Sequence, residues 1–207
     1  MLVSKESNTL PKSLISGHRK YLQNDFTANE HLHARLASEG QAPKVMWVGC
    51  ADSRVSPELI LGAKPGELFI LRNVANIIPP LEADEASVGS ALVFAVESLK
   101  VNHIVVCGHS DCGGVKALSQ LGVTPMDRML ASWIEYAVPA LEDNMGNDLE
   151  SLIKTNVVMQ AERLLEYPCV MKAASTNQLA IHACYYNISN GALTQYSPLE
   201  RAWKEFS

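Results

Sequence analysis

Two short segments, about sixty residues apart, contain the side chains best suited to bind a metal ion. The first is Cys50-Ala-Asp-Ser-Arg, and the second is His109-Ser-Asp-Cys112-Gly-Gly. Two thiolates and one imidazole are ligands that suit zinc, and three protein ligands leave the fourth tetrahedral position open for water or substrate. The pattern therefore predicts a catalytic zinc site rather than a structural one.

A carboxylate and a guanidinium follow the first of these thiols. Asp52 lies two residues after Cys50, and an ionised carboxylate there can accept a hydrogen bond and orient a zinc-bound hydroxide. Arg54 can form a bidentate pair with Asp52 and hold that carboxylate away from the metal. Without the metal ligands beside it, the pair would be interpreted as a surface ion pair. With them, we assign catalytic roles to both residues.

Apolar, β-branched runs precede both segments and predict strands. We expect strands over 45–48, 68–71, 104–107 and 178–186, and the strand over 68–71 is expected to be buried. Helices are expected over 86–99, 129–141 and 149–165. Further helices are expected to begin after Ser56, as the N-cap, and at Gly113-Gly114. The alternation predicts an α/β fold, a mostly parallel doubly wound sheet with flanking helices. Asn190-Gly191 predicts a C-terminal hairpin at one edge of the sheet. Since ligands bind where parallel strands end, both segments are well placed for a site.

The chain is expected to form a single domain over 1–207, with residues 1–42 as an N-terminal helical arm. Spaced apolar residues in this polar stretch predict one or two amphipathic helices ahead of the core. No repeat or linker interrupts the remainder. Residues 120–148 contain no motif that indicates a function, so they could form a surface insertion or an assembly contact.

Composition excludes several classes of function. The net charge of −5 and a pI near 5.7 disfavour nucleic acid and anionic membranes as partners, and no apolar run is long enough to span a bilayer. The N-terminus does not resemble a signal peptide, and five unevenly spaced cysteines favour a reduced, cytoplasmic setting. Cys107, Cys169 and Cys184 are predicted to be small buried hydrophobes. A thiol-redox protein is disfavoured because no Cys-x-x-Cys is present.

Three segments resemble the signatures of the β-class carbonic anhydrases. They are residues 48–55, 72–76 and 107–114, with a weaker similarity over 181–191. The resemblance implies interconversion of carbon dioxide and bicarbonate by zinc-hydroxide attack, with one zinc per subunit on Cys50, His109 and Cys112. It also implies Asp52 paired with Arg54, and the backbone of Gly113 at the substrate site. A homodimer, often doubled to a tetramer, is implied as well, with the N-terminal helices packed on the partner subunit.

A bacterial subgroup of that family is similar at three further positions. There a Trp, an Arg and a Tyr line a bicarbonate pocket away from the zinc, and the matching residues here are Trp47, Arg72 and Tyr186. Gly49 also matches, whereas Ala183-Cys-Tyr185 replaces the more common Gly-Trp pair. The resemblance implies that bound bicarbonate, or low pH, moves Asp52 from Arg54 to the metal as a fourth ligand. Alternatively, the two aromatic residues belong to the core and Arg72 makes a dimer contact.

Other functions could use the same residues. A zinc hydrolase of the same fold could act on carbon disulfide or carbonyl sulfide, and a non-catalytic protein could use zinc as a structural clamp. The remaining histidines are interpreted as surface or satisfied core residues rather than ligands of this zinc: His18, His31, His33, His103 and His182. None is identified as a proton shuttle.

Overall fold

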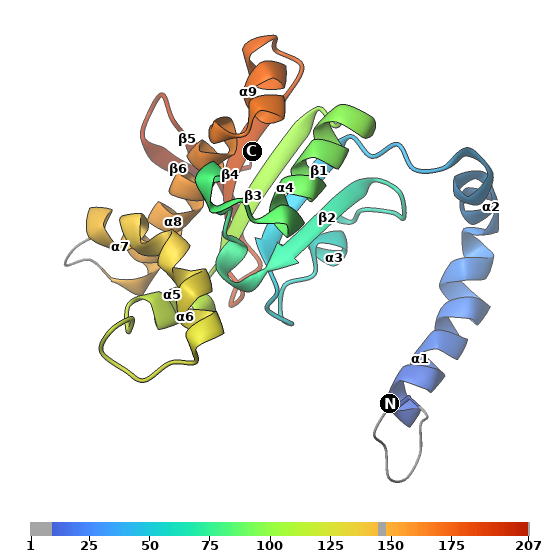
Figure 1. Ribbon diagram of the computed structural model, residues 1–207. Helices are drawn as coiled ribbons and strands as arrows, with labels where there is room; N and C mark the ends of the chain where they lie inside the picture. Colours follow the sequence, from blue (N-terminus) through green and yellow to red (C-terminus); the bar gives the residue numbers. More distant parts are fainter. Residues whose placement is uncertain (1–9, 145–147, 207) are drawn as a thin grey trace. The chain divides into compact units, whose positions relative to one another are not determined.

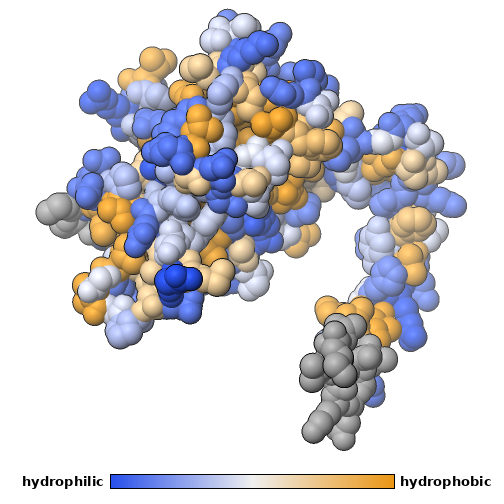
Figure 2. Space-filling view, viewed as in Figure 1, coloured by the Kyte–Doolittle hydropathy of each residue, from blue (hydrophilic) through white to orange (hydrophobic). Residues whose placement is uncertain are grey.

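The computed structural model describes residues 10–144 and 148–206 (Figure 1). The chain divides into two compact units, and the boundary falls between Gln41 and Ala42. The first contains helices α1 (Lys12–Tyr21) and α2 (Glu30–Glu39), with a π-helical turn at Leu22–Phe26. The predicted arm helices are therefore present. None of residues 10–42 is buried, and Figure 2 shows hydrophobic side chains exposed among hydrophilic ones on these helices.

The second unit is built on a six-stranded mixed sheet of order β2-β1-β3-β4-β5-β6 (Figure 1). The parallel strands are β1 (Val45–Cys50), β2 (Leu68–Asn73), β3 (His103–His109) and β4 (Ala180–Tyr186). Strands β5 (Leu193–Ser197) and β6 (Ala202–Glu205) run antiparallel. The predicted fold class is confirmed, including the hairpin after β4, where Gly191 adopts the left-handed φ of 75°. Strand β6 was not predicted, and it extends the hairpin by one strand.

Seven α-helices accompany the sheet in the described part of this unit. They are α3 (Pro57–Leu61), α4 (Ala86–Val93), α5 (Gly113–Leu118), α6 (Arg128–Ile134), α7 (Val138–Asp143), α8 (Leu149–Arg163) and α9 (Pro168–Ser175). The single helix expected over 129–141 is divided by a 3-10 turn at Glu135–Ala137, because Pro139 begins a new helix. No described helix is long and apolar enough to cross a membrane.

Two local expectations need correction. The strand at 68–71 was predicted to be buried, but β2 is only half-buried because it forms an edge of the sheet in this chain. Ser56 does precede α3, yet its hydroxyl makes no capping bond and instead lies 3.5 Å from a carboxylate oxygen of Glu58. Pro57, whose fixed φ suits the first helical position, defines the start of this helix.

The larger core covers one face of the sheet. Inward-facing residues of β1, β3 and β4 pack there against α4, α8 and α9, and a second cluster joins α5, α6 and α8 near the carboxyl ends of the strands. The opposite face carries a small cluster of Trp47, Cys107 and Cys184. All five cysteines are buried, as predicted for the three outside the metal motif. The second cluster positions the site described next.

Candidate metal centre

The predicted zinc ligands lie together at the carboxyl ends of adjacent parallel strands. Cys50 ends β1, His109 ends β3, and Cys112 immediately precedes α5. One donor atom from each lies within 4.8 Å of the others, and the two sulfur atoms are 3.8 Å apart. All three residues are buried. Such a compact set of two sulfurs and one nitrogen has the donor types that zinc prefers.

The imidazole of His109 is oriented as a metal ligand. Its Nδ1 lies 2.9 Å from the carbonyl oxygen of Ser110, so this nitrogen carries the proton and Nε2 keeps a lone pair. Nε2 is buried and has no hydrogen-bond partner among the described residues. A buried nitrogen without a partner is unusual and costly in a native protein, and a metal ion would satisfy it. The residues present therefore fit a zinc ion.

The two thiols share a proton in a way that favours metal binding. The hydrogen bond from Cys112 is the main cause that lowers the pKa of Cys50 to about 4, while the same contact raises the pKa of Cys112. The contact favours the loss of one proton from the pair, and a cation between the sulfurs would take the place of the remaining proton. Gly113 follows as the first residue of α5, and a Cβ built on it would meet no atom within 4 Å.

Asp52 and Arg54 form a bidentate ion pair beside the ligands. Arg54 donates from Nε to Oδ1 of Asp52 at 2.9 Å and from Nη2 to Oδ2 at 2.7 Å. Oδ2 of Asp52 also lies 3.8 Å from Nε2 of His109, so the carboxylate borders the metal site. Hydrogen bonds from Arg54 hold the pKa of Asp52 well below its usual range. Asp52 is therefore a carboxylate near neutral pH.

Asp111 is a residue of this site that the sequence analysis missed. Its carboxylate accepts from Nη1 of Arg54 at 3.2 Å, and its carbonyl oxygen accepts from Nη2 at 3.0 Å. Asp111 has a φ of 54°, a left-handed conformation that turns the loop between His109 and Cys112. The only available signal was its place inside the second motif. Arg54 is consequently hydrogen-bonded to a residue of each metal-binding segment, Asp52 in the first and Asp111 in the second.

Comparisons with known proteins agree with this geometry. A family model described as carbonic anhydrase matches residues 45–193. A carbonic anhydrase of Pseudomonas aeruginosa is 34% identical over 189 residues, covering 88% of this chain and 86% of the relative. The solved structure of the β-carbonic anhydrase CcaA superimposes with a TM-score of 0.87 at 29% identity, covering 94% of this chain and 98% of that one. This chain belongs to the β-class carbonic anhydrases.

Another solved structure extends the comparison. One of two tetrameric β-carbonic anhydrases from the filamentous ascomycete Sordaria macrospora superimposes with a TM-score of 0.77 at 29% identity, covering 88% of this chain and 94% of that one. Family, activity class and fold thus agree with the expectations drawn from the sequence motifs. The Cys-His-Cys cluster fits the zinc site that such an enzyme requires.

Trp47 and Tyr186, two expected bicarbonate-pocket residues of this carbonic anhydrase, belong to the small cluster on the face of the sheet opposite the larger core. Trp47 is buried, and its indole Nε1 has no hydrogen-bond partner among the described residues. Its indole lies against Gly49, which pairs in register with Arg72 of the neighbouring strand. Tyr186 packs against the same cluster as Trp47.

Arg72 connects this face to the metal-binding loop. Its Nε donates to the carbonyl oxygen of Cys50 at 2.9 Å, and its Nη2 donates to the carbonyl oxygen of Asp52 at 2.6 Å. The guanidinium thus supports the backbone on which a zinc ligand and the neighbouring carboxylate are carried. An indole N–H and a guanidinium on one face are also donors that an anion would bind.

Proposed function

We propose that this chain catalyses the reversible hydration of carbon dioxide to bicarbonate and a proton, with one zinc ion per chain on Cys50, His109 and Cys112. The observation that carries the proposal is the buried Nε2 of His109, which has no hydrogen-bond partner among the described residues and lies close to two thiols and to the Asp52–Arg54 pair. A bound zinc ion supplies a Lewis acid that makes water a nucleophile near neutral pH.

In this mechanism Asp52 positions the nucleophile. An ionised carboxylate can only accept hydrogen bonds, so Asp52 accepts a hydrogen bond from the attacking water and directs the lone pair of that oxygen towards the carbon atom. Arg54 keeps Asp52 in that orientation through two parallel bonds. The backbone at Gly113, at the open start of α5, borders the space available to the substrate.

We further propose that Asp52 acts as a switch. In the inactive state Asp52 would leave Arg54 and join Cys50, His109 and Cys112 in holding the zinc ion, and water would then be excluded from it. The proposal is supported by the 3.8 Å between Oδ2 of Asp52 and Nε2 of His109, a distance that a small rotation can shorten. Arg54 keeps its two bonds to Asp111 when Asp52 leaves, so its charge stays paired. Low pH favours this state, since water then competes less well with the carboxylate.

Bicarbonate would act on the same switch through Arg72. An anion held by Arg72, Trp47 and Tyr186 competes for the guanidinium with the carbonyl oxygens of Cys50 and Asp52. Loss of those bonds frees the loop that carries Asp52. This coupling explains how an anion outside the metal site could change the position of a carboxylate inside it. Zinc X-ray absorption at pH 6 and pH 8.5, with and without bicarbonate, tests it: three protein ligands plus water under all conditions would contradict the switch.

Assembly and location complete the proposal. A homodimer, or a tetramer formed from two dimers, with the N-terminal arm packed on the partner subunit, would cover the exposed apolar residues of that arm. A relative of this chain is described as tetrameric. The cytoplasm is the proposed location, consistent with five unpaired cysteines.

One assay separates this function from its alternatives. Zinc-loaded protein is mixed at pH 8.5 with carbon dioxide, and in parallel with carbonyl sulfide and carbon disulfide. Rapid carbon dioxide hydration with little sulfide release is expected. Hydrolysis of the sulfur compounds alone would indicate the related hydrolase, and retained zinc with no turnover of any substrate would indicate a structural metal.

A further inference from the structure

Two histidines that the sequence analysis set aside are brought together by the sheet. His103 begins β3, and His182 lies in the adjacent parallel strand β4. Nδ1 of His103 and Nε2 of His182 are 3.1 Å apart, with the ring centroids 5.2 Å apart. Because neither residue belongs to a recognisable motif, only the register of the two strands reveals the pair. The pair is far from the zinc ligands, since His109 lies six positions beyond His103 on β3, roughly 20 Å along a strand.

The separation of the two nitrogens matches two ligands on one metal ion. At metal–nitrogen distances of about 2.0–2.1 Å, nitrogens 3.1 Å apart subtend an angle of about 98° at the ion. That angle is close to the 90° of adjacent ligands in tetragonal or octahedral sites. Imidazole pairs with this geometry suit borderline divalent ions such as nickel, copper and zinc.

A neighbouring side chain contacts His182, the half-buried member of the pair. The amide group of Gln195, on β5, lies 3.2 Å from Nδ1 of His182. The atom of Gln195 at this distance is the amide nitrogen Nε2, and a 180° flip of the amide group would bring its oxygen to the same place. In that orientation Gln195 would accept the Nδ1 proton, and the lone pair of His182 would be on Nε2, directed at His103. Burial, together with the nearby His103, lowers the pKa of His182, so its ring is neutral and able to ligate.

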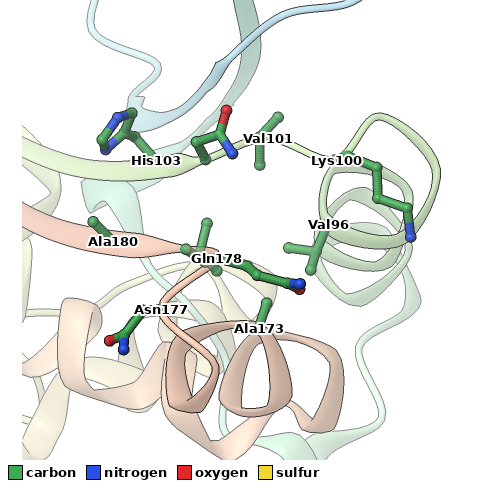
Figure 3. A pocket seen from close by; sticks show the side chains of 10 residues that line it. Val96, Lys100, Val101, His103, Ala173, Asn177, Gln178 and Ala180 are labelled. Carbon is green, nitrogen blue, oxygen red and sulfur yellow. The ribbon is translucent and has the colours of Figure 1, made fainter.

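Solvent reaches the pair on the side of His103. His103 is exposed, so water can supply the remaining ligands from that side, whereas the pocket of about 260 Å³ that borders both histidines and Gln195 is otherwise mainly apolar. A second pocket of about 640 Å³ borders His103 at the amino ends of β3 and β4. Figure 3 shows the imidazole of His103 directed away from Lys100, the cationic residue that lines this pocket.

We propose that His103 and His182 form a second metal site, which takes a borderline divalent transition-metal ion and is independent of the zinc centre. Gln195 is a positioning residue for this site. No third His, Cys, Asp or Glu joins the pair to make a closed cluster in the part of the chain that the structure describes. Water supplies the other ligands, and binding is therefore reversible.

Titration calorimetry with nickel chloride on the zinc-loaded protein tests the proposal. Nickel is chosen because it does not oxidise thiols, and zinc content is measured afterwards to show that the first site is unchanged. One nickel ion per chain is expected. His103→Ala and His182→Gln should each weaken binding at least tenfold, and Gln195→Leu should weaken it about tenfold. His31→Ala, which removes an exposed histidine of the arm, is the matched control and should bind nickel like the unsubstituted protein.

Three results would overturn the proposal. The first is that the zinc-loaded protein binds no nickel. The second is that His103→Ala and His182→Gln both still bind nickel as tightly as the unsubstituted protein. The third is that only His31→Ala abolishes nickel binding. His103→Ala removes an exposed side chain, and its zinc content and circular dichroism show whether the fold is kept. A loss of nickel affinity with zinc retained is thus assigned to the histidine pair and not to unfolding.

Discussion

At the scale of single residues, the proposed role of Asp52 depends on two hydrogen bonds that it accepts from Arg54. They keep a carboxylate ionised and aligned within 4 Å of His109, where it can either assist the nucleophile or occupy its place. A planar fork of donors achieves this better than a single ammonium group, since both oxygens of the carboxylate are held at once. Asp111 adds a second carboxylate that restrains the same guanidinium.

Replacing Arg54 should separate catalysis from metal binding. In Arg54→Gln, Asp52 is free to reach the metal, so kcat/KM for carbon dioxide hydration at pH 8.5 should fall on the order of 100-fold. Zinc content should stay at one per chain, because Cys50, His109 and Cys112 remain. Arg35→Gln, at an exposed position of the arm, is the control. Full activity in Arg54→Gln, or loss of zinc together with activity, would contradict the assigned role.

Gly49 is required by the indole that lies against it. A Cβ at this position would come within 2.4 Å of Nε1 of Trp47, which is buried and unable to move aside freely. We expect Gly49→Ala to lower the free energy of unfolding by about 1–3 kcal/mol in urea denaturation. Gly89→Ala, in α4, where the nearest atom is 3.7 Å from the added carbon, should not be destabilising. Equal stability of Gly49→Ala and the unsubstituted protein would show that Trp47 is not confined.

At the scale of elements, the candidate metal site forms because the parallel strands β1 and β3 end at the same edge of the sheet. Cys50 and His109 are the last residues of these strands, and the start of α5 adds Cys112. Helix α8 packs directly against β3. Gly108 faces α8 at a distance that allows no side chain, since a Cβ there would lie 2.4 Å from Cγ2 of Val157.

A double-mutant cycle between β3 and α8 measures this close approach. Gly108→Ala and Val157→Ala should each destabilise the protein, the first by overpacking and the second by leaving a cavity. In the double variant the new methyl group fills part of that cavity, so the total loss should be smaller than the sum by about 0.5–3 kcal/mol. Strictly additive free energies of unfolding would mean that the two residues do not meet.

Sequence reasoning succeeded where chemistry is local and failed where it depends on register. The meeting of Cys50, His109 and Cys112 was predictable because each motif is contiguous and follows an apolar strand. Strand β6 was missed, as its four residues have no partner until the hairpin before them has formed. Helix α9 was missed because Pro168 was not interpreted as its first residue. The meeting of His103 with His182, 79 residues apart, follows only from the pairing of β3 with β4.

At the scale of the whole molecule, the N-terminal arm needs a surface to pack on. Its helices have ten residues each and no buried side chain, and helices this short are marginal in water without packing. Leu14 and Leu22 are 59% and 43% exposed. Burial of such residues against a second copy of the chain would stabilise both the helices and the assembly.

Charges on the arm should therefore reduce the size of the assembly. With Leu14→Glu and Leu22→Glu combined, the mass from light scattering should fall below that of the unsubstituted protein, which we expect to be at least twice the chain mass of 22.6 kDa. Leu199→Glu, at a residue that is 98% exposed, is the control and should keep the larger mass. Unchanged mass in the arm variant would place the subunit contact elsewhere.

The most direct test of the account is stopped-flow carbon dioxide hydration by zinc-loaded protein across pH 6.5 to 9. Because the pKa of Asp52 is held well below its usual range, this carboxylate stays ionised throughout, and a change in rate arises from the ionisation of the water at the metal and from the competition of that water with Asp52. We predict rapid turnover that rises steeply above neutral pH. Rapid turnover with a flat profile would remove the Asp52 switch, and zinc-loaded protein without hydration at any pH would contradict the proposed function.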